Sequence, residues 1–495
     1  GDATNGDTLP DLEASATAGA INQFYVESTE DFTGHLNPNG AGNGTVLTGL
    51  SGIGIKENQD ATFAGVQLST LGTAQSPVGV IGAAGGNKED LIVTATTNGT
   101  TDLSNFEATA DVAVALNGGD GSAETMKGTK GPGTDTFSPG TGDDPMTGGT
   151  GGTNIYVFDG GDASNGDTIT DLDDAEATTV NQIHVITSED FTGHINPNGV
   201  GNGTALTGLD NIVITNAQTA TFAAAQLEAL TLAVSESTGA GAATLVVTPA
   251  AGGTTTLTGI TTTAQVTTSL TGGAGTETIL GTQGIDLFVG GAAIDTLTGN
   301  GGVDTFRFLN GGTVTTDRDN IKDGASTDIY DLQTSIDGSL AGSFTALVTG
   351  DGTALAGVTA GQKTDAVVAT AVDVTTAGQV TMSADASVIE FVSSGAGAGF
   401  AGGFAGLIAA QNAAFDLQKA GTGDFAANGS SPKMIAVVED STNNQIEVGI
   451  VTFATAGLVT DVADAGVATL FEIDITGGLT RAQVALAIDQ SGIAS

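Results

Sequence analysis

Carboxylates recur at a fixed interval in a glycine-rich stretch of the chain. From Gly272 the sequence divides into four nonapeptides, GGAGTETIL, GTQGIDLFV, GGAAIDTLT and GNGGVDTFR. The sixth position of each unit is acidic and holds Glu277, Asp286, Asp295 or Asp304. The eighth position is apolar and holds Ile279, Phe288, Leu297 or Phe306. A flexible linker would not keep both kinds of residue in register through four units.

This period predicts stacked β-coils that bury apolar side chains and bring carboxylates together, with residues 290–306 making two turns. Glycine supplies corners with positive φ, and the short strands between corners alternate, so the eighth residue can point inward. Stacked carboxylates repel each other if they are left bare. A hard divalent cation with oxygen ligands relieves that repulsion and becomes part of the stability of the fold. The alternative is a degenerate coil that glycine turns hold together without metal.

The stretch GGAAIDTLTGNGGVDTFRF resembles the nonapeptide repeats of the RTX (haemolysin-type) family, which form a calcium-binding parallel β-roll. The resemblance is confined to the glycine-rich blocks. It implies Ca²⁺ as the ion, with ligands from the carboxylates of Asp286, Asp295 and Asp304 and from the carbonyls of Gly284, Gly290 and Gly302. Glu277 is a further candidate ligand, although it departs from the aspartate of the family. Other departures are Thr282, Ala293 and Asn300, which stand where the family has glycine.

A more degenerate block lies at residues 118–160. It keeps Asp135 and Asp144 nine residues apart, and the period then slips by one residue to Asn154. Prolines and lysines interrupt the pattern. Asp135 and Asp144 are candidate calcium ligands, and we expect this block to bind fewer ions than the second block, or none.

A tandem duplication surrounds the two blocks. The segment from Asn22, NQFYVESTEDFTGHLNPNGAGNGTVLTGL, returns from Asn181 as NQIHVITSEDFTGHINPNGVGNGTALTGL, with 21 of 29 positions identical. His35 and His194 occupy the same place in the two copies. We expect the shared loop to cap a coil or to contact a neighbouring molecule, and a metal site at the histidine is the alternative.

The duplication and the blocks predict five segments. Residues 1–117 and 161–271 are two copies of a β-rich module, residues 118–160 and 272–311 are the blocks, and residues 312–495 are an α+β module for capping, assembly or secretion. In the last module, KMIAVVED and IEVGIVTF predict two strands that pair across STNNQ. GFAGGFAGLIAAQNAAFDLQKA predicts a helix with one apolar face, made of Phe400, Phe404, Leu407, Ile408 and Phe415. The expected fold is therefore mostly all-β, with parallel β-roll or β-solenoid blocks.

Composition restricts the function. The 56 acidic residues outnumber 11 basic ones and give a net charge of −45, which disfavours nucleic acid and anionic membranes as partners. No apolar run is long enough to insert in a membrane. The chain has no cysteine, so thiolate chemistry is excluded. It also lacks the HExxH, GxSxG and P-loop motifs, and we expect no enzyme.

These observations predict an extracellular, calcium-stabilised structural protein at the bacterial cell surface. It would assemble with copies of itself into a surface layer or a filament, and a cell-surface polysaccharide is a further partner that this address allows. By the resemblance, its export would follow a type I route. The alternative is the non-catalytic RTX portion of a secreted adhesin or enzyme whose active domain lies upstream of Gly1.

Overall fold

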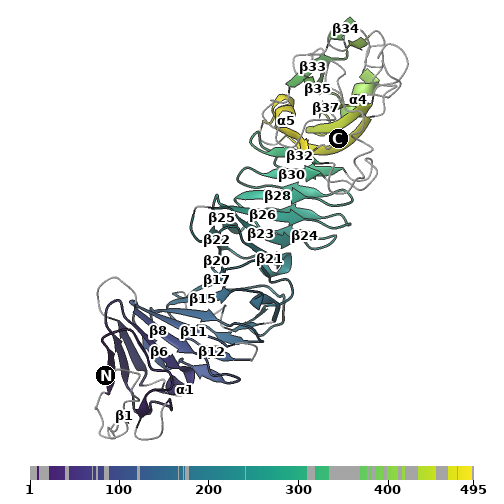
Figure 1. Ribbon diagram of the computed structural model, residues 1–495. Coiled ribbons are helices and arrows are strands. Elements are labelled where there is room, and N and C mark those ends of the chain that lie inside the picture. Colours follow the sequence, from purple (N-terminus) through teal and green to yellow (C-terminus); the bar gives the residue numbers. More distant parts are fainter. Residues whose placement is uncertain are drawn as a thin grey trace. The chain divides into compact units, whose positions relative to one another are not determined.

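Strands make up most of the regular structure in the computed structural model, and most of them pair in parallel (Figure 1). Helices are few and short among the described residues. The expectation of a mostly β chain is thus confirmed at this level. The structure describes residues 8–9, 22–38, 44–69, 71–73, 76–82, 89–119, 123–165, 167–170, 172, 178–239, 241–308, 318–333, 368–375, 378–381, 386–393, 399–410, 415–418, 433–452, 467–475 and 478–492.

Contacts divide the chain into two units. The first comprises Gly1–Val246 and Gly259–Val266, and the second comprises Val247–Thr258 and Thr267–Ser495. No helix within the described ranges has the length and apolar character needed to cross a membrane.

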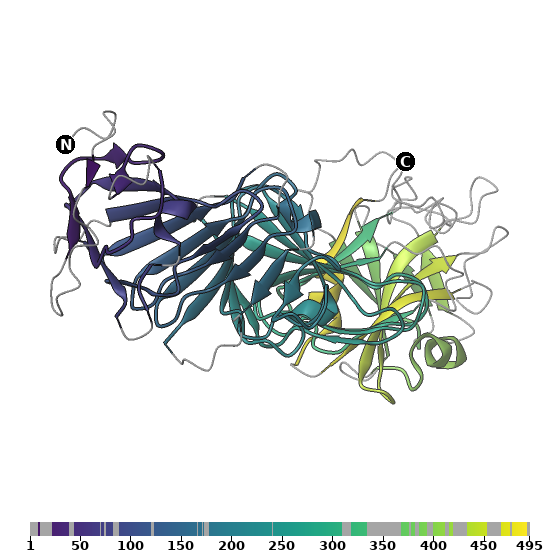
Figure 2. The same cartoon turned by 90° about the horizontal axis from the view of Figure 1, so that it is seen from below.

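The longest sheet of the first unit contains ten strands, each parallel to its neighbours. In spatial order they are β25 (Ile260–Thr262), β22 (Leu232–Glu236), β20 (Asn211–Ile214), β17 (Val180–Val185), β15 (Thr153–Phe158), β13 (Thr134–Ser138), β11 (Val112–Asn117), β8 (Glu89–Thr94), β6 (Asp60–Ala64) and β3 (Glu30–Asp31). Figure 1 labels most of these strands, and Figure 2 shows the purple and blue ones side by side from below.

Shorter sheets accompany the ten-stranded sheet in the first unit. One has the order β10 (Phe106–Ala108), β7 (Val78–Gly82), β5 (Gly52–Ile55), β2 (Gln23–Val26). Another has the order β19 (Asn196–Pro197), β16 (Thr168–Thr170), β14 (Pro145–Thr147), β12 (Thr125–Lys127), β9 (Thr100–Asp102). Strand β1 (Thr8–Leu9) pairs with β4 (Asn37–Pro38), and β18 (Glu189–Asp190) and β21 (Thr219–Ala223) are the first two strands of a further parallel sheet. Strand β23 (Ala243–Thr248) follows later in the chain.

Alternation explains why these segments form strands. In β15, with the sequence TNIYVF, Asn154, Tyr156 and Phe158 are buried while the residues between them face outward. Period two is the spacing of one face of a strand, and β-branched and aromatic residues favour that geometry.

The sequence duplication is also a structural duplication. Helices α1 (Gly65–Leu68) and α2 (Ala224–Leu227) follow equivalent strands, and each contains a buried glutamine. Gln67 Nε2 donates to the Phe32 carbonyl oxygen at 3.1 Å, and Gln226 Nε2 donates to that of Phe191 at 2.9 Å. The two copies therefore share hydrogen bonds as well as amino-acid sequence. A 3₁₀ turn lies at Asp162–Asn165.

The second unit continues the parallel pattern. Strands β26 (Val266–Thr271), β28 (Ile285–Val289), β30 (Thr305–Phe308), β32 (Ile329–Gln333) and β40 (Ile488–Gly492) are neighbours in this order. A nine-stranded sheet has the order β24 (Thr254–Thr256), β27 (Thr278–Leu280), β29 (Thr296–Thr298), β31 (Asp319–Ile321), β39 (Val467–Asp474), β38 (Gln445–Thr452), β37 (Lys433–Asp440), β35 (Ala386–Val392), β33 (Val368–Asp373). Strands β34 (Gly378–Thr381) and β36 (Phe415–Gln418) pair separately.

Register corrects one expectation about the nonapeptides. Thr278 pairs with Thr296, and Phe288 pairs with Phe306, so the pattern returns to the same sheet only after 18 residues. Consecutive nonapeptides lie in different sheets. Residues 290–306 therefore supply one strand to each of two sheets rather than two complete turns.

The eighth-position residues are buried, as expected. Ile279, Phe288, Leu297 and Phe306 are at most 1% exposed. The rings of Phe288 and Phe306 stack with centroids 5.1 Å apart, and Tyr330 continues the column 6.0 Å from Phe306. Parallel in-register pairing thus turns one sequence position into one column of the core.

Two expectations for the C-terminal segment have different outcomes. The predicted hairpin is present, because β37 pairs antiparallel with β38 from Lys433↔Thr452 to Asp440↔Gln445. The predicted long helix is wrong. Helix α4 covers only Gly403–Ala410, and Phe415 belongs to strand β36. A second helix, α5 (Arg481–Ala487), begins after Thr480, whose hydroxyl oxygen accepts the Gln483 N–H. Residues 334–367 of the segment lie outside the described ranges.

Candidate functional site

Buried acidic side chains form rows across neighbouring parallel strands. Each acid lies two positions before a buried apolar residue, as Asp295 lies before Leu297. In the second unit, the β27 row consists of Glu277, Asp295 and Asp319, and the β28 row consists of Asp286, Asp304 and Asp328. All six residues are less than 5% exposed.

A backbone hydrogen bond links each acid to the next one in its row. The Glu277 N–H donates to Asp295 Oδ1 at 2.7 Å, and the Asp295 N–H donates to Asp319 Oδ1 at 3.0 Å. In the other row, the Asp286 N–H donates to Asp304 Oδ1 at 3.0 Å, and the Asp304 N–H donates to Asp328 Oδ1 at 3.1 Å. These bonds hold the register and use one oxygen of each accepting carboxylate.

The second oxygens of the β27 row face a glycine turn. Glu277 Oε2 is buried and accepts no hydrogen bond from the described residues. A Cβ atom placed on Gly290 would lie 2.6 Å from Asp319 Oδ2 and 2.8 Å from Asp295 Oδ2. Gly290 therefore leaves room beside two buried carboxylates where any side chain would collide. Burying two ionised carboxylates side by side is costly, so this arrangement fits a cation.

The β28 row begins with a carboxylate that the protein satisfies itself. The Thr282 N–H and the Thr282 hydroxyl each donate to Asp286 at 2.8 Å. Burial still raises the pKa of Asp286 to about 7, against these hydrogen bonds. Burial, followed by the charge of Asp286, raises the pKa of Asp304 to about 8. Without a cation, these groups retain protons at a pH where ordinary aspartate is ionised.

A third acidic row, the β12 row, begins in the first glycine-rich block with Glu124 and Asp144 and continues to Asp167 beyond it. The Glu124 N–H donates to Asp144 Oδ1 at 2.6 Å, and the Asp144 N–H donates to Asp167 Oδ1 at 2.9 Å. Each of the three carboxylates also has one buried oxygen without a hydrogen-bond partner in the described part of the chain. Burial raises the pKa of Asp144 to about 6 and that of Asp167 to about 8.

The fourth row consists of Asp135, Asn154 and Asn181 and is mainly amide. Asn154 Nδ2 donates to Asn181 Oδ1 at 2.9 Å, and Asn154 Oδ1 accepts the Gly149 N–H at 2.8 Å. Asp135 is capped like Asp286, because the N–H and hydroxyl of Thr129 donate to it at 2.8 and 2.9 Å. Burial raises the pKa of Asp135 to about 6. Hydrogen bonds within the protein satisfy the polar side chains of this row, so the row gives no reason for a cation.

Some of the predicted ligands are neighbours in the structure and others are not. It brings Glu277 next to Asp295 in one row and Asp286 next to Asp304 in the other, while Asp135 and Asp144 belong to different rows. Gly284 and Gly302 occupy equivalent turns, since a Cβ on Gly302 would strike the Gly284 carbonyl oxygen. Whether these residues bind calcium stays a prediction.

Sequence reasoning missed four members of these rows: Glu124, Asp167, Asp319 and Asp328. Their spacing departs from nine residues, because loops of different length intervene. The signal that identifies them is local. Each of the four is an acid two positions before Met126, Ile169, Ile321 or Tyr330, and all of those residues are buried.

The duplicated histidines lie in equivalent turns. The His35 N–H donates to the Phe32 carbonyl at 3.1 Å, and the His194 N–H donates to the Phe191 carbonyl at 3.1 Å. Among the described residues, no three histidine or acidic side chains converge on one point as a ready metal site. A cation in the acidic rows would therefore need backbone carbonyls in addition to paired carboxylates.

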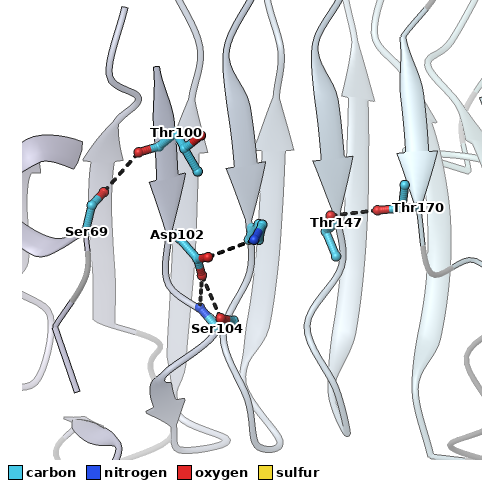
Figure 3. Close-up of polar contacts among 7 residues, drawn as sticks. Ser69, Thr100, Asp102, Ser104, Thr147 and Thr170 are labelled. Carbon is cyan, nitrogen blue, oxygen red and sulfur yellow. Dashed lines mark hydrogen bonds and ion pairs between the residues drawn. The ribbon is translucent and has the colours of Figure 1, made fainter. Parts of the chain in front are cut away.

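Two other polar features lie outside the acidic rows. On the outward side of the β9–β12–β14–β16 sheet, Lys127 Nζ contacts Asp102 Oδ2 at 2.8 Å, and the hydroxyls of Thr147 and Thr170 lie 2.6 Å apart (Figure 3). In the second unit, a cavity of about 360 Å³ is lined by residues that include Asp323, Ser326 and Gln483. Both oxygens of Asp323 accept backbone N–H groups, from Gly299 and Asn300 at 2.7 Å each, so this carboxylate has a structural role.

Comparisons of the chain with protein-family models, with curated proteins and with solved structures found no match.

Proposed function

We propose that the chain is a calcium-stabilised parallel β-solenoid of the RTX type that acts as an extracellular structural protein. The observation that carries this proposal is the set of buried acidic rows, whose carboxylates lie against glycine turns and in which one oxygen each of Glu124, Asp144, Asp167 and Glu277 accepts no hydrogen bond from the described residues. Such rows are unfavourable without a positive charge and favourable with one. The in-register parallel strands support the solenoid, because a return to the same sheet after 18 residues is what a two-sided coil requires.

The β27 row is the best candidate to hold calcium. Neighbouring pairs of carboxylates, Glu277 with Asp295 or Asp295 with Asp319, would supply charge, and carbonyl groups of the turns at Gly272 and Gly290 would supply neutral oxygens. Calcium prefers such oxygen ligands and tolerates irregular geometry. When bound, the ion would neutralise the row and join successive strands.

The β12 row of the first block fits the ion by the same criteria, through Glu124, Asp144 and Asp167. This extends the sequence expectation, which favoured few or no ions in that block. The amide row beside it would need none.

A calcium titration followed by circular dichroism and thermal unfolding tests the metal assignment. We expect calcium to raise the melting temperature and EGTA to reverse the effect, because an ion that binds only the folded chain stabilises it. The double variant Glu277→Gln, Asp295→Asn should lose part of the response. Asp102→Asn is the matched control, since that carboxylate is half-exposed, lies outside the acidic rows and is paired with Lys127. Indifference of the wild-type chain to both calcium and EGTA would overturn the assignment.

The structural role is proposed on the duplicated module. Two copies with the same buried glutamine bonds present the same surface loop twice, as repeated contacts in a layer or filament require. Electron microscopy with calcium and then with chelator tests this role. We expect ordered sheets or fibres that dissolve on chelation. Monodisperse particles in both conditions would instead favour the non-catalytic part of a secreted adhesin or enzyme.

A further inference from the structure

The outward side of the ten-stranded sheet in the first unit carries two long rows without charged residues. In the first row, register pairing places six side chains next to one another: Ile92, Ala115, Thr136, Ile155, Gln182 and Asn211. In the second row, Val157, His184, Val213 and Ser235 are paired in the same way. We call these two rows, from β8 to β22, the uncharged face.

The lack of charge contrasts with the rest of the chain. Acidic residues outnumber basic ones by 56 to 11, yet none lies within the uncharged face. Acids lie only at its margins: Asp90 two residues before Ile92, Asp159 two residues after Val157, and Asp31, which continues the first row beyond Thr62. His184 is the one titratable residue of the face. Its Nε2 lies 3.1 Å from Gln182 Oε1, and burial lowers its pKa, so the ring is neutral at pH 7.

A second outward surface of the same unit shows that the uncharged face is not a general property of these sheets. On the β9–β12–β14–β16 sheet, the ion pair of Asp102 and Lys127 occupies neighbouring positions of one outward row (Figure 3). Apart from Gln182, His184 and Asn211, the side chains of the uncharged face are small or β-branched. In-register strands with such side chains can pack against another sheet at a spacing of about 10 Å.

We propose that the uncharged face binds the same face of a second copy of this chain. The partner follows from charge, because two molecules of net charge −45 repel each other least where neither presents a carboxylate. The face has no arginine or lysine for an anionic partner and no Trp, Tyr or Phe on which a sugar ring could stack. The proposal rests on the proposed function in one respect, which is that the chain assembles with itself.

The size of the face sets the strength of the contact. Seven strands at about 4.8 Å spacing cover about 30 Å, and the two rows with their margins cover about 15 Å along the strands. Two such faces bury on the order of 1,000 Å² in total, which is near the lower limit for a specific interface. We therefore expect a weak, concentration-dependent dimer that becomes firm only within a larger assembly.

Charge introduced at the centre of the face tests the proposal. Thr136→Glu adds a carboxylate on an outward, half-buried position of β13, and Thr125→Glu adds one at a similar position of β12 as the control. We expect sedimentation velocity to show concentration-dependent dimers for the wild type and Thr125→Glu, and at least a tenfold weaker association for Thr136→Glu. Unchanged association of Thr136→Glu would overturn the proposal.

A cross-linking experiment makes the test independent of charge. The chain has no cysteine, so Thr136→Cys introduces a single thiol at the middle of the face. Oxidation should give disulfide-linked dimers of Thr136→Cys and not of Thr125→Cys. A wild type that stays monomeric at millimolar concentration but binds a cell-surface polysaccharide through this face would assign the face to a glycan and overturn the self-contact.

The melting response to calcium separates this proposal from the metal assignment. Thr136→Glu should keep the full calcium response, because it lies outside the acidic rows. Loss of the dimer with a retained calcium response would support the proposed self-contact through the uncharged face. A calcium-insensitive chain that still forms the dimer would also support the self-contact and would overturn the metal assignment.

Discussion

Asn154 and Asp304 occupy equivalent places in the two glycine-rich blocks, each two residues before a stacked aromatic side chain. In the first block, Asn154 joins Asn181 through its amide, and the row is neutral and hydrogen-bonded. In the second block, Asp304 follows Asp286 and precedes Asp328, and its pKa rises to about 8 because the row is acidic and buried. An amide ladder and an acidic ladder thus support the same strand register. They differ in the charge that they bury, since the amide ladder is mostly neutral and every side chain of the acidic ladder is a carboxyl group.

The largest expected effect separates the two ladders by pH and calcium. Folded-state pKa values of about 7 for Asp286 and about 8 for Asp304 exceed the value of about 3.9 for an unfolded aspartate. The calcium-free folded chain therefore binds more protons than the unfolded chain, and its stability falls as pH rises from about 4 to about 8.

Scanning calorimetry at pH 5 and pH 8 measures this effect. In EGTA, the melting temperature should be higher at pH 5. Calcium should raise it by about 10 °C or more at pH 8 and much less at pH 5, because several ions each contribute a few kcal/mol. A calcium-free melting temperature that rises with pH would contradict the acidic rows as described.

Filling the glycine cradle should have the next largest effect. In Gly290→Ala, the new methyl group would meet the second oxygens of Asp295 and Asp319. We expect a loss of about 1–3 kcal/mol from overpacking and a reduced number of bound calcium ions by equilibrium dialysis. Gly79→Ala is the control, because its nearest contact would be an ordinary 3.9 Å from the Ile81 side chain. Equal ion counts in the two variants would remove Gly290 from the site.

Converting the amide ladder to an acidic one should cost about 1–3 kcal/mol in EGTA. In Asn154→Asp, the donors to Asn181 Oδ1 and to the Gly149 carbonyl are lost, and a second carboxylate joins Asp135. Urea unfolding would measure the change, with Asn216→Asp in an exposed turn as the control. A neutral result for Asn154→Asp would show that the amide row has no role in stability.

The smallest effect concerns the threonine that caps Asp286. Thr282→Val removes the hydroxyl donor at 2.8 Å and leaves the backbone donor, so we expect a loss of about 1 kcal/mol in EGTA. Thr298→Val, on an outward position of β29, is the control. If calcium then stabilises Thr282→Val more than the wild type, the hydroxyl and the ion are alternative ways to compensate Asp286.

Sequence periodicity predicted the strands and the core position but not the pairing of the acids. Ile279 and Phe288 both occupy the eighth position of a nonapeptide, yet the 18-residue register places them in different sheets. A nine-residue period does not show how many nonapeptides make one turn of the coil. The acids outside the nonapeptides, such as Asp167 and Asp319, were missed because loop lengths hide them from any fixed period. Helix α4 was overestimated because its apolar spacing continues into residues that form strand β36, where strand pairing prevails over local pattern.

Spacing between successive members of the rows varies from 18 residues for Glu277 and Asp295 to 27 for Asn154 and Asn181, yet register is kept. Register therefore depends on the position of a residue within its strand and not on the number of residues between strands. In evolutionary terms, such an array can gain or lose loop residues at its corners without a compensating change in its core. It can also grow by copying a whole segment, as the repeat from Asn22 at Asn181 shows, and for the same reason it should accept a foreign peptide at a corner as a display scaffold.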